Sequence, residues 1–400
     1  MAQIDDAKVS FHAVYTERHR TLGAHHDDTL SSLNSLAHVL KIQGQFDEAY
    51  EVYKRVLDAR RVTLGETSEG YLYTLCDFSD LLKKMGRCLE AQDGLRLAYE
   101  TRKEVLGPEH RRTIWTASSL ASALKSRGAE YYEESHALYT QVLESSKQMH
   151  MYKNQMHPDY LYRVADFADL LAKMGELEES EKKFRMVHAA RQEVLGAHHR
   201  RTVWTACSLA SVLKAQGRFD EAYKLYSDVL DVSAKDLSDS HPDFLYRLCA
   251  FADLLAKMGR HTEAETRFRS AYEARTKKLG SDHPDTVWTA SSLASVLKLE
   301  GRYEEAHDLL LYVLKESETI FSSKDPERLY RICSFADLLS HMGRHAEAEV
   351  HLCMAYDTRR QVLGPEHADT LWTAQRLFSV RAAIERGTEA LQLRARAAES

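Results

Sequence analysis

The sequence predicts an all-α protein, a solenoid of about nine helix-turn-helix repeats, and two observations carry that prediction. First, glycines lie between amphipathic segments at intervals of 42 residues, with a single interval of 47, and self-similarity of this length is typical of repeat architectures. Second, the 400 residues include only 6 Pro and 17 Gly, a composition that favours helices over strands and turns. The recurring glycines are Gly44, Gly86, Gly128, Gly175, Gly217, Gly259, Gly301 and Gly343.

Residues 285–317 show why each unit should form two helices. Leu293 and Leu297 are one turn apart and share an apolar stripe with neighbouring alanines, which is typical of a buried helical face. Gly301 can adopt the left-handed backbone conformation that ends the first helix, and the small Ala306 lets the second helix cross the first closely. One pair of helices cannot bury such stripes alone, so we expect the pairs to stack.

The segments that join the units predict where helices begin and end. A histidine precedes many of the first helices, and we expect it to cap and pack the helix start. At 283–285 the chain reads His-Pro-Asp, and a proline in the first helical turn lacks only an N–H that would be unpaired anyway. Glycines further upstream lie where a C′ residue would end the preceding helix. The histidines are His26, His110, His199, His283 and His367, and the glycines are Gly23, Gly107, Gly196, Gly280 and Gly364.

The two ends of the array are expected to differ from the units between them. A first helix near residues 5–18 has the character of a half-repeat cap, so we assign residues 1–17 to an N-terminal capping helix and residues 18–400 to the solenoid. A ninth unit is expected around residues 372–397, with Glu385 at the position of the turn glycine.

The units come in two alternating kinds, so the true period is about 84 residues. Tryptophan-type units read Trp-Thr-Ala-x-Ser-Leu-Ala-Ser, and tyrosine-type units read Leu-Tyr-Arg-x-x-x-Phe-Ala-Asp-Leu-Leu. The first kind begins at Trp115, Trp204 and Trp288, and the second contains Tyr162 and Tyr246, with variants at Tyr73 and Tyr330. Because the kinds alternate, we expect the exposed faces to alternate as well.

The spacing Leu293-Ala294…Gly301…Ala306 resembles the tetratricopeptide repeat, lengthened to 42 residues by the connection Leu-Gly-x-x-His-Pro-Asp-Thr. The longer form is similar to the repeats of kinesin light chains, and the resemblance covers roughly residues 18–398. It implies a right-handed superhelix whose first helices line a concave groove, and a role in protein–protein interaction. Kinesin light chains carry a long heptad coiled coil before their repeats, whereas only about seventeen residues precede the repeats here. Association with a kinesin heavy chain is therefore not implied.

In such a groove the first helix of each unit presents one face to the shared hollow. Trp288 and Ser295 are nearly two helical turns apart and share a face opposite the apolar stripe. The same positions in the other units predict a row of aromatic residues, a row that alternates Asp and Ser, and a cationic rim. The candidate ligand-binding residues are Tyr73, Trp115, Tyr162, Trp204, Tyr246, Trp288, Tyr330, Asp169, Asp253, Asp337, Arg163, Arg247, Arg331, Lys214 and Lys298.

Structural roles for the same side chains stay open. Aromatic residues near a helix start often pack against the loop of the neighbouring unit, and aspartates in a concave face are often paired with Arg or Lys of the next unit. Packing alone, however, does not require eight consecutive aromatic residues in one position. Exposed aromatic and cationic side chains are also the types that dominate binding hot spots.

Composition and motifs narrow the chemistry. The net charge is −6 with both signs interspersed, so nucleic acid is not an expected partner, and no segment approaches the eighteen apolar residues of a membrane span. No P-loop, H-E-x-x-H or G-x-S-x-G motif occurs, so no catalytic residue, cofactor or metal is expected. The cysteines form no CxxC pair, which predicts reduced thiols and a cytoplasmic location. Cys207, Cys249 and Cys333 are expected to face the groove as small space-filling residues.

The array has one irregular segment, residues 129–157, where the repeat interval lengthens. Met149, His150, Met151, Met156 and His157 form a tract that could bind a soft metal such as Cu(I). Incidental Met and His in a loop insertion is the preferred interpretation, because no second ligand cluster accompanies the tract. Whether the segment forms a lip over the groove or a simple irregularity stays open.

Two functions from different classes remain. The first is an interaction scaffold that binds a partner segment, acidic with an aromatic or apolar anchor, whose carboxylates meet Lys and Arg while Trp and Tyr hold the anchor. The alternative is an enzyme or small-molecule-binding protein, for example in a biosynthetic pathway, that uses an aromatic- and Asp-lined cavity enclosed by the superhelix. Tetratricopeptide grooves typically grip peptides through asparagines of the first helix, and only Asn34 holds such a position here, which favours the alternative. Whether the protein is an enzyme therefore stays open.

Overall fold

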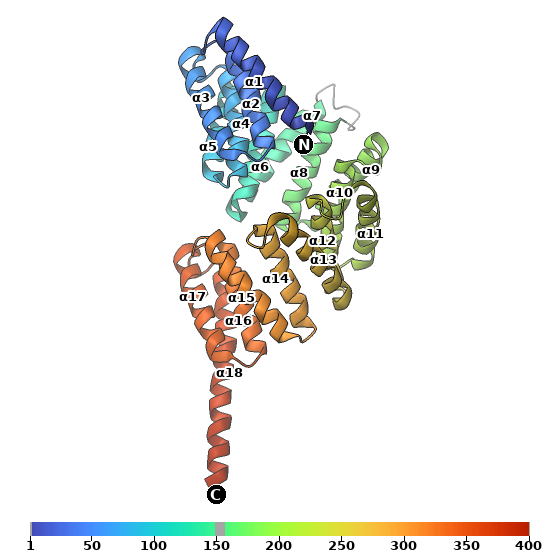
Figure 1. The fold of residues 1–400 in the computed structure, drawn as a ribbon, viewed down its shortest axis with the longest axis vertical. Helices are drawn as coiled ribbons and strands as arrows, with labels where there is room; N and C mark the ends of the chain where they lie inside the picture. The colour runs from blue at the N-terminus through green and yellow to red at the C-terminus, as the bar shows by residue number, and fades with distance from the viewer. Residues whose placement is uncertain (1, 149–156, 400) are drawn as a thin grey trace. The chain divides into compact units, whose positions relative to one another are not determined.

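The computed structural model describes residues 2–148 and 157–399, and every regular element in those ranges is helical (Figure 1). The chain divides into two compact units, the first unit (Met1–Ser208) and the second unit (Leu209–Ser400), and each of them contains several of the repeated helix pairs. Within the described residues, eighteen α-helices follow one another as antiparallel neighbours. The prediction of an all-α array of helix pairs is therefore confirmed.

The first unit begins with α1, which packs against α2, and continues as pairs of a first and a second helix. Its elements are α1 (Ala2–Leu22), α2 (Asp27–Ile42), α3 (Phe46–Leu64), α4 (Glu69–Lys84), α5 (Cys88–Leu106), α6 (Arg111–Arg127), the 3₁₀ turn η1 (Ala129–Tyr131), α7 (Tyr132–Gln148), α8 (Pro158–Met174) and α9 (Leu177–Leu195). The next helix, α10 (Arg200–Ala215), contains the boundary between the units.

The second unit continues the same alternation. Its elements are α11 (Phe219–Asp236), α12 (Pro242–Lys257), α13 (His261–Leu279), α14 (Pro284–Leu299), α15 (Tyr303–Ile320), α16 (Pro326–His341), α17 (His345–Leu363) and α18 (Ala368–Glu399). Among the described residues, no helix combines the length and the apolar character that crossing a bilayer requires.

The first helices of successive pairs lie on the inner side of the curve in each unit. In the first unit α4 contacts α2 and α6, and α6 also contacts α8. In the second unit α12 contacts α14, and α16 contacts α18. First helices that touch one another line the shorter path of a curved stack. The face that they present away from their second helices is therefore the concave face of each unit.

The apolar stripe predicted from the sequence is the core. In the unit at residues 285–317, Leu293, Leu297 and Ala306 are all 1% exposed or less. Gly301 follows the first helix with φ of +77°, a conformation that glycine adopts without strain. The amide of Arg302 donates to the carbonyl of Leu297 at 3.0 Å, which is the hydrogen bond that closes a Schellman turn.

Histidines cap the first helices, as the sequence predicts. In each of seven first helices the histidine Nδ1 accepts a hydrogen bond from the amide two residues later, at 3.1 to 3.3 Å. Ser68 takes this place before α4, and Asp325 takes it before α16. Such a cap pairs one of the amides that a helix start leaves without a partner. The seven residues are His26, His110, His157, His199, His241, His283 and His367.

Replacing His283 by alanine is expected to lower the free energy of unfolding by about 1 kcal/mol, because the amide of Asp285 loses its acceptor. His283→Asp and His283→Ser are matched controls, since Asp325 caps the start of α16 and Ser68 caps the start of α4. Urea unfolding followed by circular dichroism measures the difference. If the alanine variant is as stable as the two controls, the histidine is not acting as a cap.

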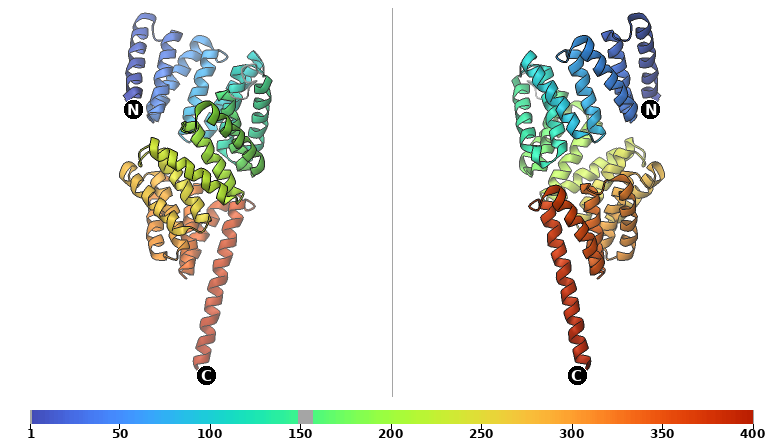
Figure 2. Two further views of the ribbon diagram at one scale, coloured as in Figure 1. Left: turned by 90° about the vertical axis from the view of Figure 1, so that its right-hand side faces the viewer. Right: turned by 90° about the vertical axis from the view of Figure 1, so that its left-hand side faces the viewer.

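The last unit differs from its prediction. A turn was expected at Glu385, but α18 continues through this residue to Glu399 as one helix, and its final turns extend beyond the other helices of the second unit (Figures 1 and 2). The physical reason is local: Glu385 is a good helix former and stands where the other units have a glycine with positive φ. At the other end, α1 extends to Leu22, and we propose that it caps the first unit.

The irregular segment begins with a changed turn after α6. Gly128 has φ of +130°, and η1 follows it in place of the usual short turn. The Arg127 guanidinium lies 3.9 Å from the centre of the Tyr131 ring. Most of the Met/His tract, residues 149–156, lies outside the described residues, while His157 caps α8.

Candidate functional site

The aromatic residues predicted to line the groove all lie at the surface. Their exposed fractions range from 41% to 63%, although large aromatic side chains are usually well buried. Two of the rings also contact the preceding helix pair: the Trp204 ring lies 6.3 Å from that of Phe184, and the Trp288 ring lies 6.0 Å from the Arg275 guanidinium. We call these seven residues the aromatic row: Tyr73, Trp115, Tyr162, Trp204, Tyr246, Trp288 and Tyr330.

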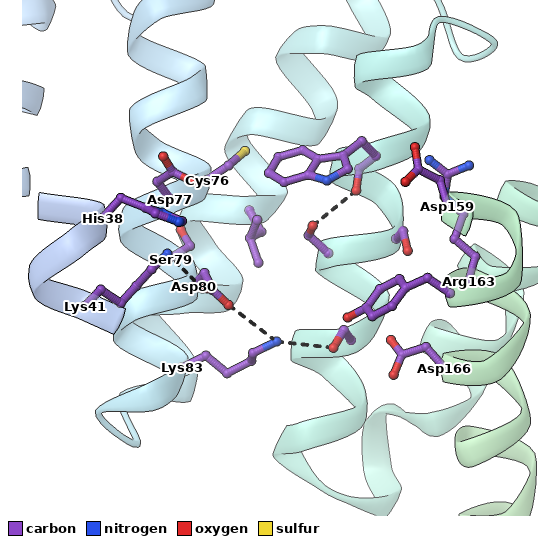
Figure 3. A pocket seen from close by; sticks show the side chains of 16 residues that line it. His38, Lys41, Cys76, Asp77, Ser79, Asp80, Lys83, Asp159, Arg163 and Asp166 are labelled. Atoms are coloured by element: carbon purple, nitrogen blue, oxygen red, sulfur yellow. Dashed lines mark hydrogen bonds and ion pairs between the residues drawn. The ribbon is translucent and has the colours of Figure 1, made fainter. Parts of the chain in front are cut away.

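In the first unit the aromatic row lines a cavity of about 320 Å³ between α2, α4, α6 and α8 (Figure 3). Trp115 and Tyr162 both contribute to its wall. Between them, Ser118, Ser119 and Ser122 of α6 present hydroxyl groups along the floor. We call this cavity the first pocket.

The second unit contains an equivalent cavity of about 550 Å³, lined by α12, α13, α14 and α16. Trp288 takes the place of Trp115, and Tyr330 takes the place of Tyr162. Serines again follow the tryptophan: Ser291, Ser292 and Ser295. Each unit therefore has a pocket on a tryptophan-type first helix with a tyrosine-type helix on either side, and we call this one the second pocket.

The aspartate row and the lysine rim pair with each other. The Lys214 Nζ lies 2.6 Å from an Asp253 carboxylate oxygen, and Lys298 pairs with Asp337 in the same way. The pairs join residues 39 positions apart, so each one ties a tryptophan-type unit to the next tyrosine-type unit. The alternative that these aspartates are paired with Lys or Arg of a neighbouring repeat is what the structure shows, although both lysines belong to the preceding repeat rather than the next one. The expected cationic rim is corrected accordingly, since Lys214 and Lys298 are 18% and 23% exposed.

The pairs reappear in the first unit with one addition. The Lys41 Nζ lies 2.9 Å from Asp80. Lys125 bridges two carboxylates, Asp166 at 2.5 Å and Asp169 at 2.9 Å, and its side chain is only 8% exposed. Asp169 is therefore held by a cation of the preceding unit rather than left open to the groove.

Burial and ion pairing act in opposite directions on Asp337. Burial alone would raise the pKa of its carboxyl group, but the hydrogen bond and charge of Lys298, together with the charge of Arg376, leave that pKa below its ordinary value. The carboxylate is therefore the stable form at neutral pH, and the cross-unit pair remains ionic there.

The three arginines predicted for the groove are largely buried, although Arg163 lines the first pocket and Arg331 lines the second. Arg163, Arg247 and Arg331 are only 3%, 7% and 3% exposed. Each donates a hydrogen bond to a serine of the preceding second helix, Arg247 to Ser233 at 2.7 Å for example. The reason is helical geometry, because a residue adjacent to the exposed tyrosine is rotated by about 100° and faces the neighbouring helix. The other two serines are Ser146 and Ser317.

The remaining unit junctions use the opposite arrangement, which the sequence reasoning missed. There the arginine lies on the second helix and donates to a threonine of the next first helix, as Arg102 does to Thr116 at 2.6 Å. A signal was present, because each of these arginines precedes a helix-ending glycine by five residues. The arginine and threonine pairs are Arg60 with Thr74, Arg102 with Thr116, Arg191 with Thr205, Arg275 with Thr289, and Arg359 with Thr373.

The cysteines that were expected to face the groove lie beneath it. Cys207, Cys249 and Cys333 are at most 7% exposed. Burial raises the pKa of Cys249 to about 11, so its thiol is protonated and weakly nucleophilic.

Asn34 is also 95% buried, and its amide donates to Asp77 at 3.0 Å. Its amide nitrogen is therefore committed to a residue of the next helix pair. Within the described ranges, no three His, Cys, Asp or Glu side chains cluster in a way that could hold a metal ion.

The sequence profile of the tetratricopeptide repeat family matches residues 28–103, 161–235 and 246–314, and a second tetratricopeptide repeat profile matches residues 329–369. Together the matches cover more than half of the chain. The protein belongs to the tetratricopeptide repeat family. A search of curated proteins found no significant relative.

Solved structures similar to this tetratricopeptide repeat protein agree with the fold. The apo form of the quorum sensor NprR from B. thuringiensis aligns with a TM-score of 0.57 and 12% identity, over 89% of this chain and 99% of NprR. A tetratricopeptide repeat protein from Parabacteroides merdae aligns with a TM-score of 0.53 and 14% identity, over 78% of this chain and 98% of that one. Kinesin light chain nearly identical TPR-like repeats from Podosopora anserina match with 24% identity and a TM-score of 0.46, over 52% of this chain and 98% of theirs.

Proposed function

We propose that this tetratricopeptide repeat protein is an interaction scaffold whose concave faces bind a segment of a partner protein. The observation that carries the proposal is the aromatic row, whose seven members are 41% to 63% exposed in one repeated position. Two pairs of them line equivalent pockets, one in each unit. Exposed indole and phenol rings in concave sites are the groups that most often anchor a bound protein.

The second pocket suits an aromatic or apolar anchor side chain. In the second pocket Trp288 and Tyr330 offer ring faces, and Leu299 is 57% exposed beside them. The serine hydroxyls of α14 can pair with the polar groups of a bound backbone. Such a site combines a large apolar contact area with a few oriented polar groups, as ligand sites generally do.

The preference for acidic residues in the partner rests on other lysines than those first expected. Lys84, Lys173 and Lys257 are exposed near the ends of tyrosine-type first helices, and none has an ion pair within 4.0 Å in the part of the chain that the structure describes. Lys257 also lines the second pocket. These ammonium groups are available to carboxylates that flank the anchor.

All six cysteines are free thiols, which supports a reducing, cytoplasmic location.

A peptide-display selection against the full chain tests the proposal. Selected peptides are expected to share an aromatic or apolar residue flanked by acidic ones, and the double variant Trp115→Ala and Trp288→Ala should weaken their binding by at least about tenfold, as loss of hot-spot residues does. Leu311→Ala is the control, because Leu311 is 52% exposed but lies on a second helix. Unchanged binding by the double variant, measured by titration calorimetry, would contradict the proposed groove.

The alternative function, binding or converting a small molecule, is favoured by the size of the pockets. About 320 Å³ and 550 Å³ are within the range of small-molecule sites. Native mass spectrometry of the purified protein separates the two functions. A copurified compound that is lost in the Trp288→Ala variant would support the small-molecule alternative. A protein that copurifies with no compound and binds a selected peptide would support the scaffold.

A further inference from the structure

The two pockets share most of their positions but differ in charge at three of them, one of which is Lys83 of the first pocket, where the second has Ala256. Where the first pocket has Asp77 on α4 and Asp166 on α8, the second unit has Ala250 on α12 and Ser334 on α16. Figure 3 shows Asp77 and Asp166 on opposite walls of the first pocket, with α6 between them. The difference is therefore concentrated at the sides of the cavity.

Three of the four carboxylates in the first pocket already have a cation. Asp80 lies 2.9 Å from Lys41, Asp166 lies 2.5 Å from Lys125, and Asp159 lies 3.8 Å from Arg111. These ion pairs are part of the contacts between units. They leave little unbalanced negative charge for a ligand.

Asp77 differs from the other three because its partner is neutral. Its carboxylate accepts a hydrogen bond from the Asn34 amide at 3.0 Å, and within the described residues no Lys, Arg or His nitrogen lies within 4.0 Å of it. Asn34 is 95% buried, so the hydrogen bond from its amide nitrogen holds the Asp77 carboxylate in one position. The Oδ1 of Asn34 has no partner. The negative charge of Asp77 reaches its surroundings, since it raises the pKa of Tyr73.

The nearby cations of the first pocket do not neutralise Asp77. Lys83 donates to the Ser122 hydroxyl at 3.3 Å and lies 4.0 Å from Asp80. Arg163 also lines the pocket, but it is 3% exposed and donates to the Ser146 hydroxyl at 3.0 Å. The pocket therefore presents one oriented carboxylate beside two exposed rings, the combination that recognises organic cations.

We propose that the first pocket binds the guanidinium or ammonium group of a basic side chain, with Asp77 as its counter-ion and Trp115 and Tyr162 as its walls. The proposal rests on the proposed function, because that side chain belongs to the bound partner segment. The second pocket, with Ala250 in place of the carboxylate, takes an uncharged anchor. The two pockets therefore bind different residues of a partner segment, a basic residue in the first and an uncharged one in the second.

The test uses the full chain and Nα-acetyl-L-arginine amide as the probe, with the indole N–H signals of Trp115 and Trp288 followed by NMR. In the unmodified protein the probe should shift the Trp115 signal. Asp77→Ala copies the second pocket and should weaken this response by at least about tenfold. Ala250→Asp copies the first pocket and should create a response at Trp288. Asp77→Asn keeps an acceptor for Asn34, so its loss of response would be due to charge rather than to misfolding.

Three outcomes would overturn the proposal: an equal response to Nα-acetyl-L-glutamine amide, full binding by Asp77→Asn, or no response at Trp115 at all. Failure here is distinguishable from failure of the proposed function. Peptides selected on the protein would still lose affinity in the double variant Trp115→Ala and Trp288→Ala while binding Asp77→Asn normally. A circular dichroism spectrum identical to that of the unmodified protein is required of each variant.

Discussion

Replacing Arg102 by alanine is expected to lower the free energy of unfolding by about 3 to 5 kcal/mol, the cost typical of breaking a buried ion pair. The Arg102 side chain is 1% exposed. It lies 2.7 Å from Glu69 and donates to Thr116 at 2.6 Å. The substitution leaves the Thr116 hydroxyl without this donor, leaves Glu69 with only the more exposed Arg112 at 3.3 Å, and opens a void between α5 and α6. These changes are unfavourable.

The effect should concentrate at one junction because each unit of a solenoid contacts only its neighbours. Hydrogen exchange is therefore expected to increase most in α5 and α6, while urea unfolding followed by circular dichroism gives the size of the loss. Arg20→Ala is the control: that guanidinium is 73% exposed and pairs with Glu17 three residues away on α1, so its removal should leave the midpoint unchanged. Equal effects of the two substitutions would show that the buried arginine does not hold the units together.

Replacing Lys125 by methionine is expected to lower the free energy of unfolding by about 1.5 to 3 kcal/mol at neutral pH, the range for hydrogen bonds to charged groups. Methionine preserves the apolar stem but removes the ammonium group that bridges Asp166 and Asp169. Two neighbouring carboxylates then lose their shared cation and repel each other. Lys173→Met is the control, since Lys173 is exposed on α8 and has no ion pair within the described residues.

The same pair predicts how the stability difference varies with pH. Burial alone would lower the pKa of Lys125, but the charges of Asp166 and Asp169 outweigh it and raise that pKa. A raised folded-state pKa contributes stability that is complete below the unfolded-state value and is lost as pH rises through the folded-state value. The difference between the unmodified protein and Lys125→Met should therefore be constant from about pH 7 to pH 9 and shrink above about pH 10.5. A difference that shrinks between pH 7 and pH 9 would contradict the assignment.

Local patterns in the sequence determined the helices and their ends. The 42-residue spacing of glycines and the histidines before the first helices were sufficient, because turn conformations and caps depend on a few adjacent residues. The exposed position of the aromatic row was also predictable, since residues such as Trp288 and Ser295 are fixed on one face by the helical period. The turn expected at Glu385 was wrong because the residue that makes the turn is itself replaced.

Only the tertiary structure decided which polar side chains reach the groove. Arg247 follows an exposed tyrosine by one residue, yet its guanidinium lies buried against Ser233 of the preceding helix. Lys298 and Asp337 pair across 39 residues of sequence, and Asp77 stays without a cation because Asn34 of the preceding unit holds it. Such pairings depend on the stagger and rotation between stacked helices. The helical period fixes the direction of a side chain on its own helix, but not which residue of the neighbouring helix it meets.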